Sequence, residues 1–86
     1  MTLQDTFIQA VADSKTLSAR PDNNTLLKLY SLYKQATEGD NTEDVPSNPF
    51  DIVGKAKHNA WDALKGLSAD DAKTQYTNLV NTLKNS

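Results

Sequence analysis

Residues 26–39, LLKLYSLYKQATEG, constrain the fold most, because they use more of a helix surface than a packed core needs. A helix turns by about 100° per residue, which places Leu29, Leu32 and Ala36 on one strip. The adjoining strip holds Leu26, Tyr30, Tyr33, Lys34 and Thr37. A surface helix usually shows an apolar stripe of a little over ~100°, and the combined arc here is about twice as wide. One strip therefore predicts a core contact, and the other predicts a binding surface.

The second strip has a particular chemistry. Tyr30, Tyr33 and Lys34 are three and four residues apart, so their side chains are neighbours on a helix. A phenol face can stack on a flat ring, and an ammonium group can hold an anion. The spacing favours a ligand that carries both features.

Length and composition exclude several classes of protein. The 86 residues predict one domain, residues 1–86. A net charge of −2 and a pI near 5.1 argue against a nucleic-acid-binding protein. The absence of cysteine from the sequence excludes disulfides and zinc-thiolate sites. No basic N-terminal region precedes an apolar run, and no run approaches the ~18 residues of a membrane span. We therefore expect a cytoplasmic protein without stable membrane insertion.

Four segments repeat apolar residues at helical spacing and predict a small all-α, four-helix bundle. They are residues 3–16, residues 22 or 23 to 37, residues 52–65, and the segment from Ser68 to about residue 84. The boundaries rest on capping-box pairs at Thr2 and Asp5 and at Ser68 and Asp71, a cap at Asp22 or Asn23, and breaks at Pro21, Gly39 and Gly66. Residues 38–51 are expected to form a long surface loop that Phe50 and Val45 anchor.

Two lysines lie on or beside apolar faces. Lys57 falls between Val53 and Trp61 on the third predicted helix, and Lys15 lies beside Val11 on the first. Each can extend its ammonium group into solvent, or meet an anion. Tyr76 lies among aliphatic residues of the last helix, where it is either a core tyrosine or a ligand contact.

Catalytic chemistry has little support in the residues. His58 is the one imidazole, and it is predicted on the polar side of its helix without a nucleophile beside it. The acidic loop lacks the ligand spacing of a calcium-binding loop. We therefore expect no catalytic residue, no metal site and no cofactor.

The sequence resembles the acyl-CoA-binding protein family over nearly its whole length. One matching run extends from Pro21 to Gly39 and includes Leu26, Leu29, Tyr30, Ser31, Tyr33, Lys34, Gln35, Ala36 and Thr37. A second contains Gly54-Lys55-Ala56-Lys57, Ala60-Trp61 and Leu64-Lys65-Gly66, while Phe7, Lys15 and Tyr76 also match. The resemblance implies a bundle of skewed up-down-down-up topology. It also implies a monomeric carrier of medium- to long-chain fatty acyl-CoA esters without catalysis. The enzymes that would donate or accept the acyl-CoA do not follow from the sequence.

The resemblance also implies roles for individual residues. Tyr33 would stack on the adenine, and Tyr30, Lys34 and Lys57 would hold the 3′-phosphate. Tyr76 would reach the ribose or pantetheine, with Lys15 near the polar part of the ligand. Val11, Leu26 and Leu27 would line the acyl groove. The sequence departs from the family's common pattern at Val53, often lysine, and at His58, commonly aromatic.

Two other functions can be set against the carrier. The tyrosine-rich face could dock a partner helix, in which case Lys57 would be dispensable and CoA derivatives would not bind. A thioesterase or transferase would have to turn over acyl-CoA.

Overall fold

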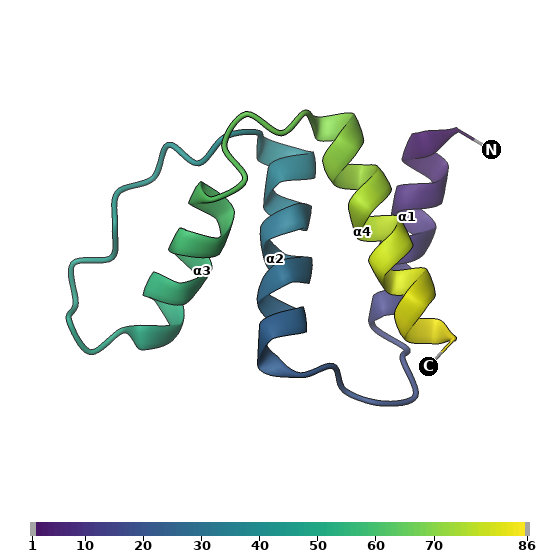
Figure 1. The fold of residues 1–86 in the computed structure, drawn as a ribbon, viewed down its shortest axis with the longest axis horizontal. Coiled ribbons are helices and arrows are strands. Elements are labelled where there is room, and N and C mark those ends of the chain that lie inside the picture. The colour runs from purple at the N-terminus through teal and green to yellow at the C-terminus, as the bar shows by residue number, and fades with distance from the viewer. Residues whose placement is uncertain (1, 86) are drawn as a thin grey trace.

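The computed structural model describes residues 2–85, which form four α-helices. They are α1 (Leu3–Ser14), α2 (Asn23–Glu38), α3 (Ile52–Asp62) and α4 (Ala69–Lys84). Figure 1 shows α1 and α4 running in one direction and α2 and α3 in the opposite one. This is the up-down-down-up arrangement of an all-α bundle, as predicted.

The helices form a flat molecule measuring 41 × 28 × 15 Å. Helix α4 packs against both α1 and α2, whereas α3 packs against α2 alone among the described helices (Figure 1). Most of the hydrophobic core consequently lies among α1, α2 and α4.

Capping side chains explain where the helices begin. Thr2 Oγ1 accepts the Asp5 N–H at 3.1 Å, and Asp5 Oδ2 accepts the Thr2 N–H at 3.4 Å, so the predicted capping box is complete. Ser68 Oγ accepts the Asp71 N–H in the same way at 3.0 Å. At α2 the cap is Asp22, and its bond to a backbone N–H of the first turn lowers the pKa of that carboxyl group.

Two helices end earlier than the periodicity predicts. α1 stops at Ser14 instead of residue 16, and α3 at Asp62 instead of residue 65. After α3 the chain continues in tighter turns, in which the Leu64 N–H donates to the Trp61 carbonyl at 3.0 Å. Gly66, at φ 91°, then adopts a left-handed conformation that suits glycine and directs the chain into α4.

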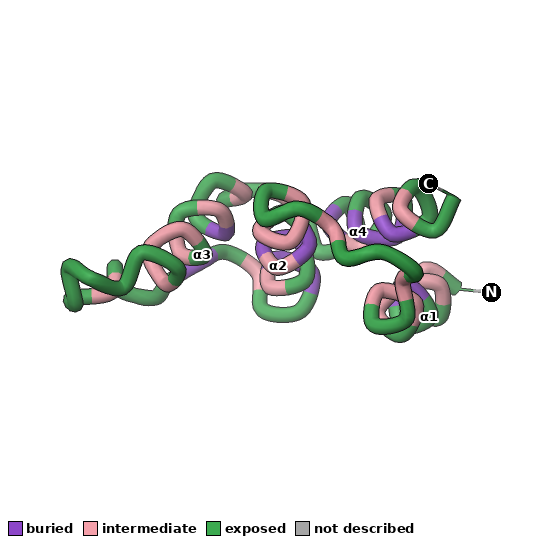
Figure 2. Tube along the Cα trace, turned by 90° about the horizontal axis from the view of Figure 1, so that it is seen from below, coloured by how far each residue is buried: buried purple, intermediate pink, exposed green. Residues whose placement is uncertain are grey.

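The core follows the predicted apolar stripes of α1, α2 and α4. It contains Phe7, Ala10, Leu29, Leu32, Ala36, Ala72, Tyr76 and Val80, all buried. In α3, whose residues are all described, Trp61 is the one buried residue. Figure 2 accordingly shows α3 and the loop before it largely exposed or half-buried.

The prediction that Phe50 and Val45 anchor the long loop is wrong. These side chains are 87% and 58% exposed. The loop runs along the far side of α3 from the core, so its apolar side chains have no core to reach (Figure 1). Polar contacts hold it instead: buried Asn41 accepts the Glu43 N–H at 2.8 Å, and His58 Nε2 lies 3.0 Å from the Glu43 carbonyl.

A hydrogen-bonded junction joins the end of α2 to the segment between α3 and α4. Fully buried Gln35 donates through Nε2 to Asp40 Oδ1 at 2.9 Å and to the Leu67 carbonyl at 2.8 Å. Asp40 Oδ1 also accepts the Gly66 N–H at 2.9 Å. The Gly66 N–H first, and then Gln35, lower the pKa of the Asp40 carboxyl group. The junction therefore ties α2 to the connection between α3 and α4.

Candidate ligand-binding site

Two adjoining recesses open along α2. The first, which we call the tyrosine pocket, has a volume of about 310 Å³ and is lined by Val11, Ser14, Lys15, Pro21, Leu26, Leu29, Tyr30, Tyr33 and Tyr76. The second, the α2–α3 groove, has a volume of about 570 Å³ and is lined by Arg20, Asn23, Leu26, Leu27, Tyr30, Ile52, Val53, Ala56 and Lys57. Leu26 and Tyr30 line both recesses. Each volume falls within the range of roughly 300–1,000 Å³ typical of small-molecule sites.

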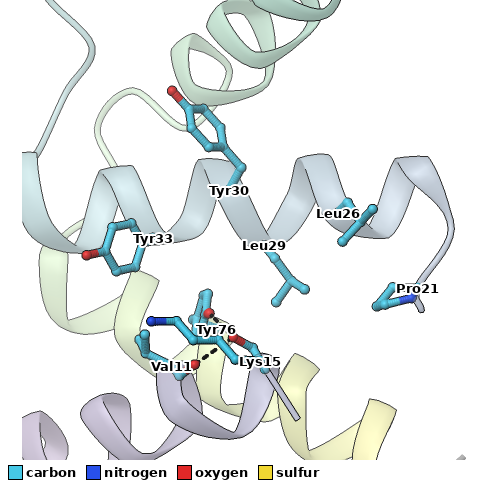
Figure 3. Close-up of a pocket in the computed structure, with 9 residues that line it drawn as sticks. Val11, Lys15, Pro21, Leu26, Leu29, Tyr30, Tyr33 and Tyr76 are labelled. Carbon is cyan, nitrogen blue, oxygen red and sulfur yellow. Dashed lines mark hydrogen bonds between the residues drawn. The ribbon is translucent and has the colours of Figure 1, made fainter. Parts of the chain in front are cut away.

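Tyr33 presents an aromatic surface in the tyrosine pocket. Its ring stacks on that of buried Phe7, with centroids 6.1 Å apart and planes 26° apart, yet the residue is 40% exposed. Figure 3 shows Tyr33 and Tyr30 projecting from different sides of α2, with Tyr30 directed toward α3. Tyr33 is thus supported from behind and accessible within the pocket, which suits it to stack on a planar group.

Tyr76 belongs to the core and also lines the tyrosine pocket. It is buried, and its ring meets Phe7 edge-on with centroids 5.3 Å apart. Its hydroxyl donates to Ser14 Oγ at 3.1 Å, and Ser14 Oγ donates to the Val11 carbonyl at 2.7 Å (Figure 3). The two readings of Tyr76 from the sequence are therefore compatible, because a core ring also forms part of the pocket wall.

Lys57 and Tyr30 meet in the α2–α3 groove. The Lys57 ammonium lies 5.2 Å from the centre of the Tyr30 ring, a cation–π arrangement. Lys57 is exposed, and Val53 on the same predicted face is 64% exposed. Most of this face of α3 is therefore a groove wall instead of a core contact.

Lys34 has a different environment. Its ammonium forms an ion pair with Glu38 and lies 4.9 Å from the centre of the Trp61 ring. Hydrogen bonding to Glu38 is the main cause that raises the pKa of Lys34. Lys34 is not among the residues that line either recess, so the structure puts the two predicted phosphate lysines against different aromatic rings.

The remaining predicted site residues are divided between the recesses. Lys15 and Val11 line the tyrosine pocket, and Leu27 lines the α2–α3 groove. Sequence reasoning missed Arg20, which directly precedes Pro21, and Ile52, the first residue of α3; both line the groove. An arginine directly before the helix-breaking Pro21 and an apolar residue opening a helix were the available signals.

Residues 2–85 contain neither a clustered set of metal ligands nor a helix suited to span a membrane. No group of three or more His, Cys, Asp or Glu residues in this range is placed to hold a metal ion. No helix in the same range is both long and apolar enough to cross a membrane.

Comparison with known proteins identifies the family. The sequence model of the family described as Acyl CoA binding protein matches residues 4–80. The chain is 54% identical to Acyl-CoA-binding protein homolog 1 of Caenorhabditis elegans, over 96% of this chain and 93% of that protein. It is 45% identical to the Acyl-CoA-binding protein of Dictyostelium discoideum, over 91% and 92% of the two chains. The fold superimposes on the crystal structure of Oryza sativa Acyl-CoA-Binding Protein 2 with a TM-score of 0.89 and 36% identity, covering 95% of this chain and 90% of that one. The chain is therefore a member of the acyl-CoA-binding protein family.

Proposed function

We propose that this protein binds medium- to long-chain fatty acyl-CoA esters and carries them without chemical conversion. The observation that carries the proposal is that Leu26 and Tyr30 line both recesses, which joins the aromatic rings of the tyrosine pocket to the apolar and cationic side chains of the α2–α3 groove. An acyl-CoA has a flat base and phosphates at one end and an alkyl chain at the other. Two adjoining recesses that together offer aromatic, cationic and apolar side chains suit such a ligand.

Each site residue has a role in this proposal. Tyr33 stacks on the adenine, supported by its accessible ring and by Phe7 behind it. Tyr30, Lys34 and Lys57 hold the 3′-phosphate, supported by the position of the Lys57 ammonium over the Tyr30 ring. The other assigned residues are Tyr76 at the ribose or pantetheine, Lys15 near the polar part of the ligand, and Val11, Leu26 and Leu27 along the acyl chain.

Burial of the acyl chain supplies much of the affinity. Each CH₂ group removed from water contributes about 0.8 kcal/mol, while charge-assisted bonds to phosphate orient the ligand. Carrying needs no general base or nucleophile. The imidazole of His58 lies against the loop carbonyl of Glu43 and lines neither recess.

Calorimetric titration tests the proposal with three ligands: palmitoyl-CoA, free CoA and palmitate. We expect palmitoyl-CoA to bind much more tightly than either fragment, and affinity for acyl-CoA to rise with chain length until the groove is full. Equal affinity for acetyl-CoA and palmitoyl-CoA would refute an acyl groove. Release of free CoA from palmitoyl-CoA by the pure protein would point to an enzyme instead.

The phosphate assignment can be tested through Lys57. Lys57→Ala should weaken palmitoyl-CoA binding roughly ten- to a hundredfold, because it removes a charge-assisted contact worth about 1.5–3 kcal/mol. The same substitution should cost much less with dephospho-palmitoyl-CoA, which lacks the 3′-phosphate. Equal losses for both ligands would contradict the assignment. Full tolerance of Lys57→Ala would instead favour a helix-docking face.

Lys34 requires a second comparison, since Glu38 occupies its ammonium group in the free protein. If the ligand phosphate binds Lys34, it competes with that carboxylate. Glu38→Gln should therefore raise the affinity for palmitoyl-CoA in the wild-type background but not in Lys34→Ala. An equal effect in both backgrounds would remove Lys34 from the proposed site.

We also propose that residues 1–86 act as one domain, as a monomer in the cytoplasm, without nucleic-acid partners or stable membrane insertion. The net charge of −2 supports the absence of nucleic-acid partners. Sedimentation analysis with and without palmitoyl-CoA should give the mass of one chain in both states. A ligand-dependent dimer would contradict this part of the proposal.

A further inference from the structure

Phe50 is the most exposed large apolar side chain in residues 2–85. Its exposure is 87%, compared with 76% for Ile52, 64% for Val53 and 58% for Val45. All four of these exposed side chains fall within nine residues of the sequence, and Phe50 is the largest and the most exposed of them.

The ligand site accounts for only part of this region. Ile52 and Val53 line the α2–α3 groove, where a bound ligand would cover them. Phe50 and Val45 line neither recess. The exposure of the phenylalanine ring therefore needs a separate explanation.

Phe50 is presented by a rigid turn. The side chain of Asn48 accepts the Phe50 N–H through Oδ1 at 2.9 Å, and the Asn48 carbonyl accepts the Asp51 N–H at 3.1 Å. Asparagine at the first position of a turn and proline at the second are favoured, because the amide side chain bonds to the backbone and the proline ring fixes φ. Asn48, Pro49 and Phe50 thus hold the ring outward without help from the core.

The same turn is joined directly to α3. Asp51 closes the turn and also caps the helix, because its Oδ1 accepts the Gly54 N–H at 2.9 Å. The backbone of Phe50 is consequently held in a fixed position relative to the helix axis. A preformed backbone loses little conformational freedom on binding, and buried aromatic side chains commonly dominate protein interfaces.

The charge around the turn indicates the kind of partner. No lysine or arginine occurs between Lys34 and Lys55. Of the five carboxylates in this segment, Glu38 pairs with Lys34, Asp40 accepts from Gln35 and Gly66, and Asp51 caps α3, so the acidic surface of the loop rests on Glu43 and Asp44. Glu43 and Asp44 are exposed. Anionic membrane surfaces attract basic segments, so an acidic loop disfavours them and favours a protein surface with basic residues.

We propose that the turn Asn48–Asp51 docks a partner protein that recognises Asn48-Pro49-Phe50 as a turn, with an apolar pocket for the Phe50 ring and a basic rim facing the acidic loop. The docking surface lies outside the residues that line the ligand site. Carrier and partner could therefore be joined while an acyl-CoA stays bound, which is the arrangement that delivery of a ligand to a partner needs.

The probe for the test is a purified domain that recognises Asn-Pro-Phe tripeptides, immobilised for surface plasmon resonance with the full chain as analyte. Wild type should bind, and Phe50→Ala should bind at least about tenfold more weakly. Asn48→Ala, which keeps the ring but removes the bond from Oδ1 to the Phe50 N–H, should also weaken binding. Val45→Ala, in the same loop but outside the turn, is the matched control and should bind as wild type does.

The salt dependence of binding provides an independent test of the basic rim. Wild-type binding should weaken as salt increases, and replacing both Glu43→Gln and Asp44→Asn should reduce that dependence. Failure of wild type to bind the probe, or equal binding by Phe50→Ala, would overturn the proposal.

Two further measurements separate the docking turn from the ligand site and from a membrane site. Phe50→Ala should keep the wild-type melting temperature and its affinity for palmitoyl-CoA; a large loss of that affinity would assign Phe50 to the ligand instead. Vesicles of phosphatidylcholine, with and without phosphatidylserine, should not retain the protein. Retention that Phe50→Ala abolishes would replace the protein partner with a bilayer.

Discussion

Asp40 shows how one side chain can hold two elements together, since a single oxygen accepts both the Gly66 N–H and the Gln35 amide. These bonds favour the ionised form, so the pKa of Asp40 lies below its ordinary value of 3.8. A carboxyl group whose pKa is lower in the folded protein stabilises the fold at pH values above its pKa in the unfolded chain. This stabilisation is lost as the pH falls through the folded-state pKa. Wild type should therefore lose stability on acidification partly through Asp40.

Asp40→Asn provides the measurement. The amide keeps an oxygen acceptor but does not ionise, so wild type should be the more stable protein at pH 6. The difference in unfolding free energy between the two proteins should become smaller toward pH 2. Urea unfolding at a series of pH values gives both curves. Asp44→Asn in the same loop controls for loss of one negative charge. A gap for Asp40→Asn that stayed constant from pH 6 to 2 would contradict the explanation.

Tyr33 combines packing with accessibility. Its ring contacts those of Phe7 and Tyr76 with centroids 6.1 and 6.3 Å away, so Tyr33→Ala should cost about 0.5–1.5 kcal/mol per aromatic pair lost. It should also weaken palmitoyl-CoA binding, if the ring stacks on adenine. Tyr33→Phe keeps the ring and should leave both properties near wild type in unfolding and titration experiments. A Tyr33→Ala protein with wild-type affinity would exclude the stacking role.

Helix α3 depends on one buried side chain. Trp61 is 3% exposed, and its Nε1 donates to the Gly39 carbonyl at 2.8 Å. Trp61→Ala should cost about 3–5 kcal/mol, a large share of the roughly 5–15 kcal/mol that stabilises a small domain. Amide hydrogen exchange should rise in α3 well before it rises in α1 and α4. Trp61→Phe, which loses mainly the hydrogen bond, should show a smaller increase in amide exchange in α3. If Trp61→Ala raised amide exchange equally in every helix, α3 would not be a separate unit.

The sequence predicted the helices well because their apolar residues repeat with the helical period, as the buried strip Leu29, Leu32 and Ala36 illustrates. Tyr30, Tyr33 and Lys57 line the recesses, and helical periodicity also indicated which face of its helix each of them occupies. The pairing of Lys34 with Glu38 could have been read from their four-residue spacing.

The loop and the junction at Asp40 were less predictable. Periodicity carries no information on a segment without regular structure, so the apolar character of Phe50 alone predicts an anchor, whereas the side chain is 87% exposed. Gln35 and Leu67 lie 32 residues apart in the chain, and local patterns do not report a bond over that separation.

The molecule as a whole extends 15 Å along its shortest axis, compared with 41 Å along its longest. Few residues in such a plate can be buried from all sides, so a ligand along α2 would add packing that the free protein lacks. Palmitoyl-CoA at a free concentration of one hundred times its Kd should add about 2.7 kcal/mol to the unfolding free energy. That corresponds to a rise in Tm of roughly 10–20 °C for a domain of this size.

Differential scanning calorimetry measures this shift. Lys57→Ala should need a higher palmitoyl-CoA concentration to reach the same Tm, because its affinity is lower. Acetyl-CoA at the same concentration should give a much smaller shift. An identical shift with both thioesters would mean that the acyl chain adds nothing to the complex.

Leu26 and Tyr30 line both recesses, so in the proposed complex the two halves of an acyl-CoA would bind next to one another. In that complex, binding of the nucleotide end would keep the covalently linked alkyl chain close to the apolar side chains proposed to contact it. A short flexible connection gives an effective local concentration in the millimolar range. The second contact then forms as an intramolecular event, so hydrolysis of the thioester would end the mutual reinforcement and let both products leave.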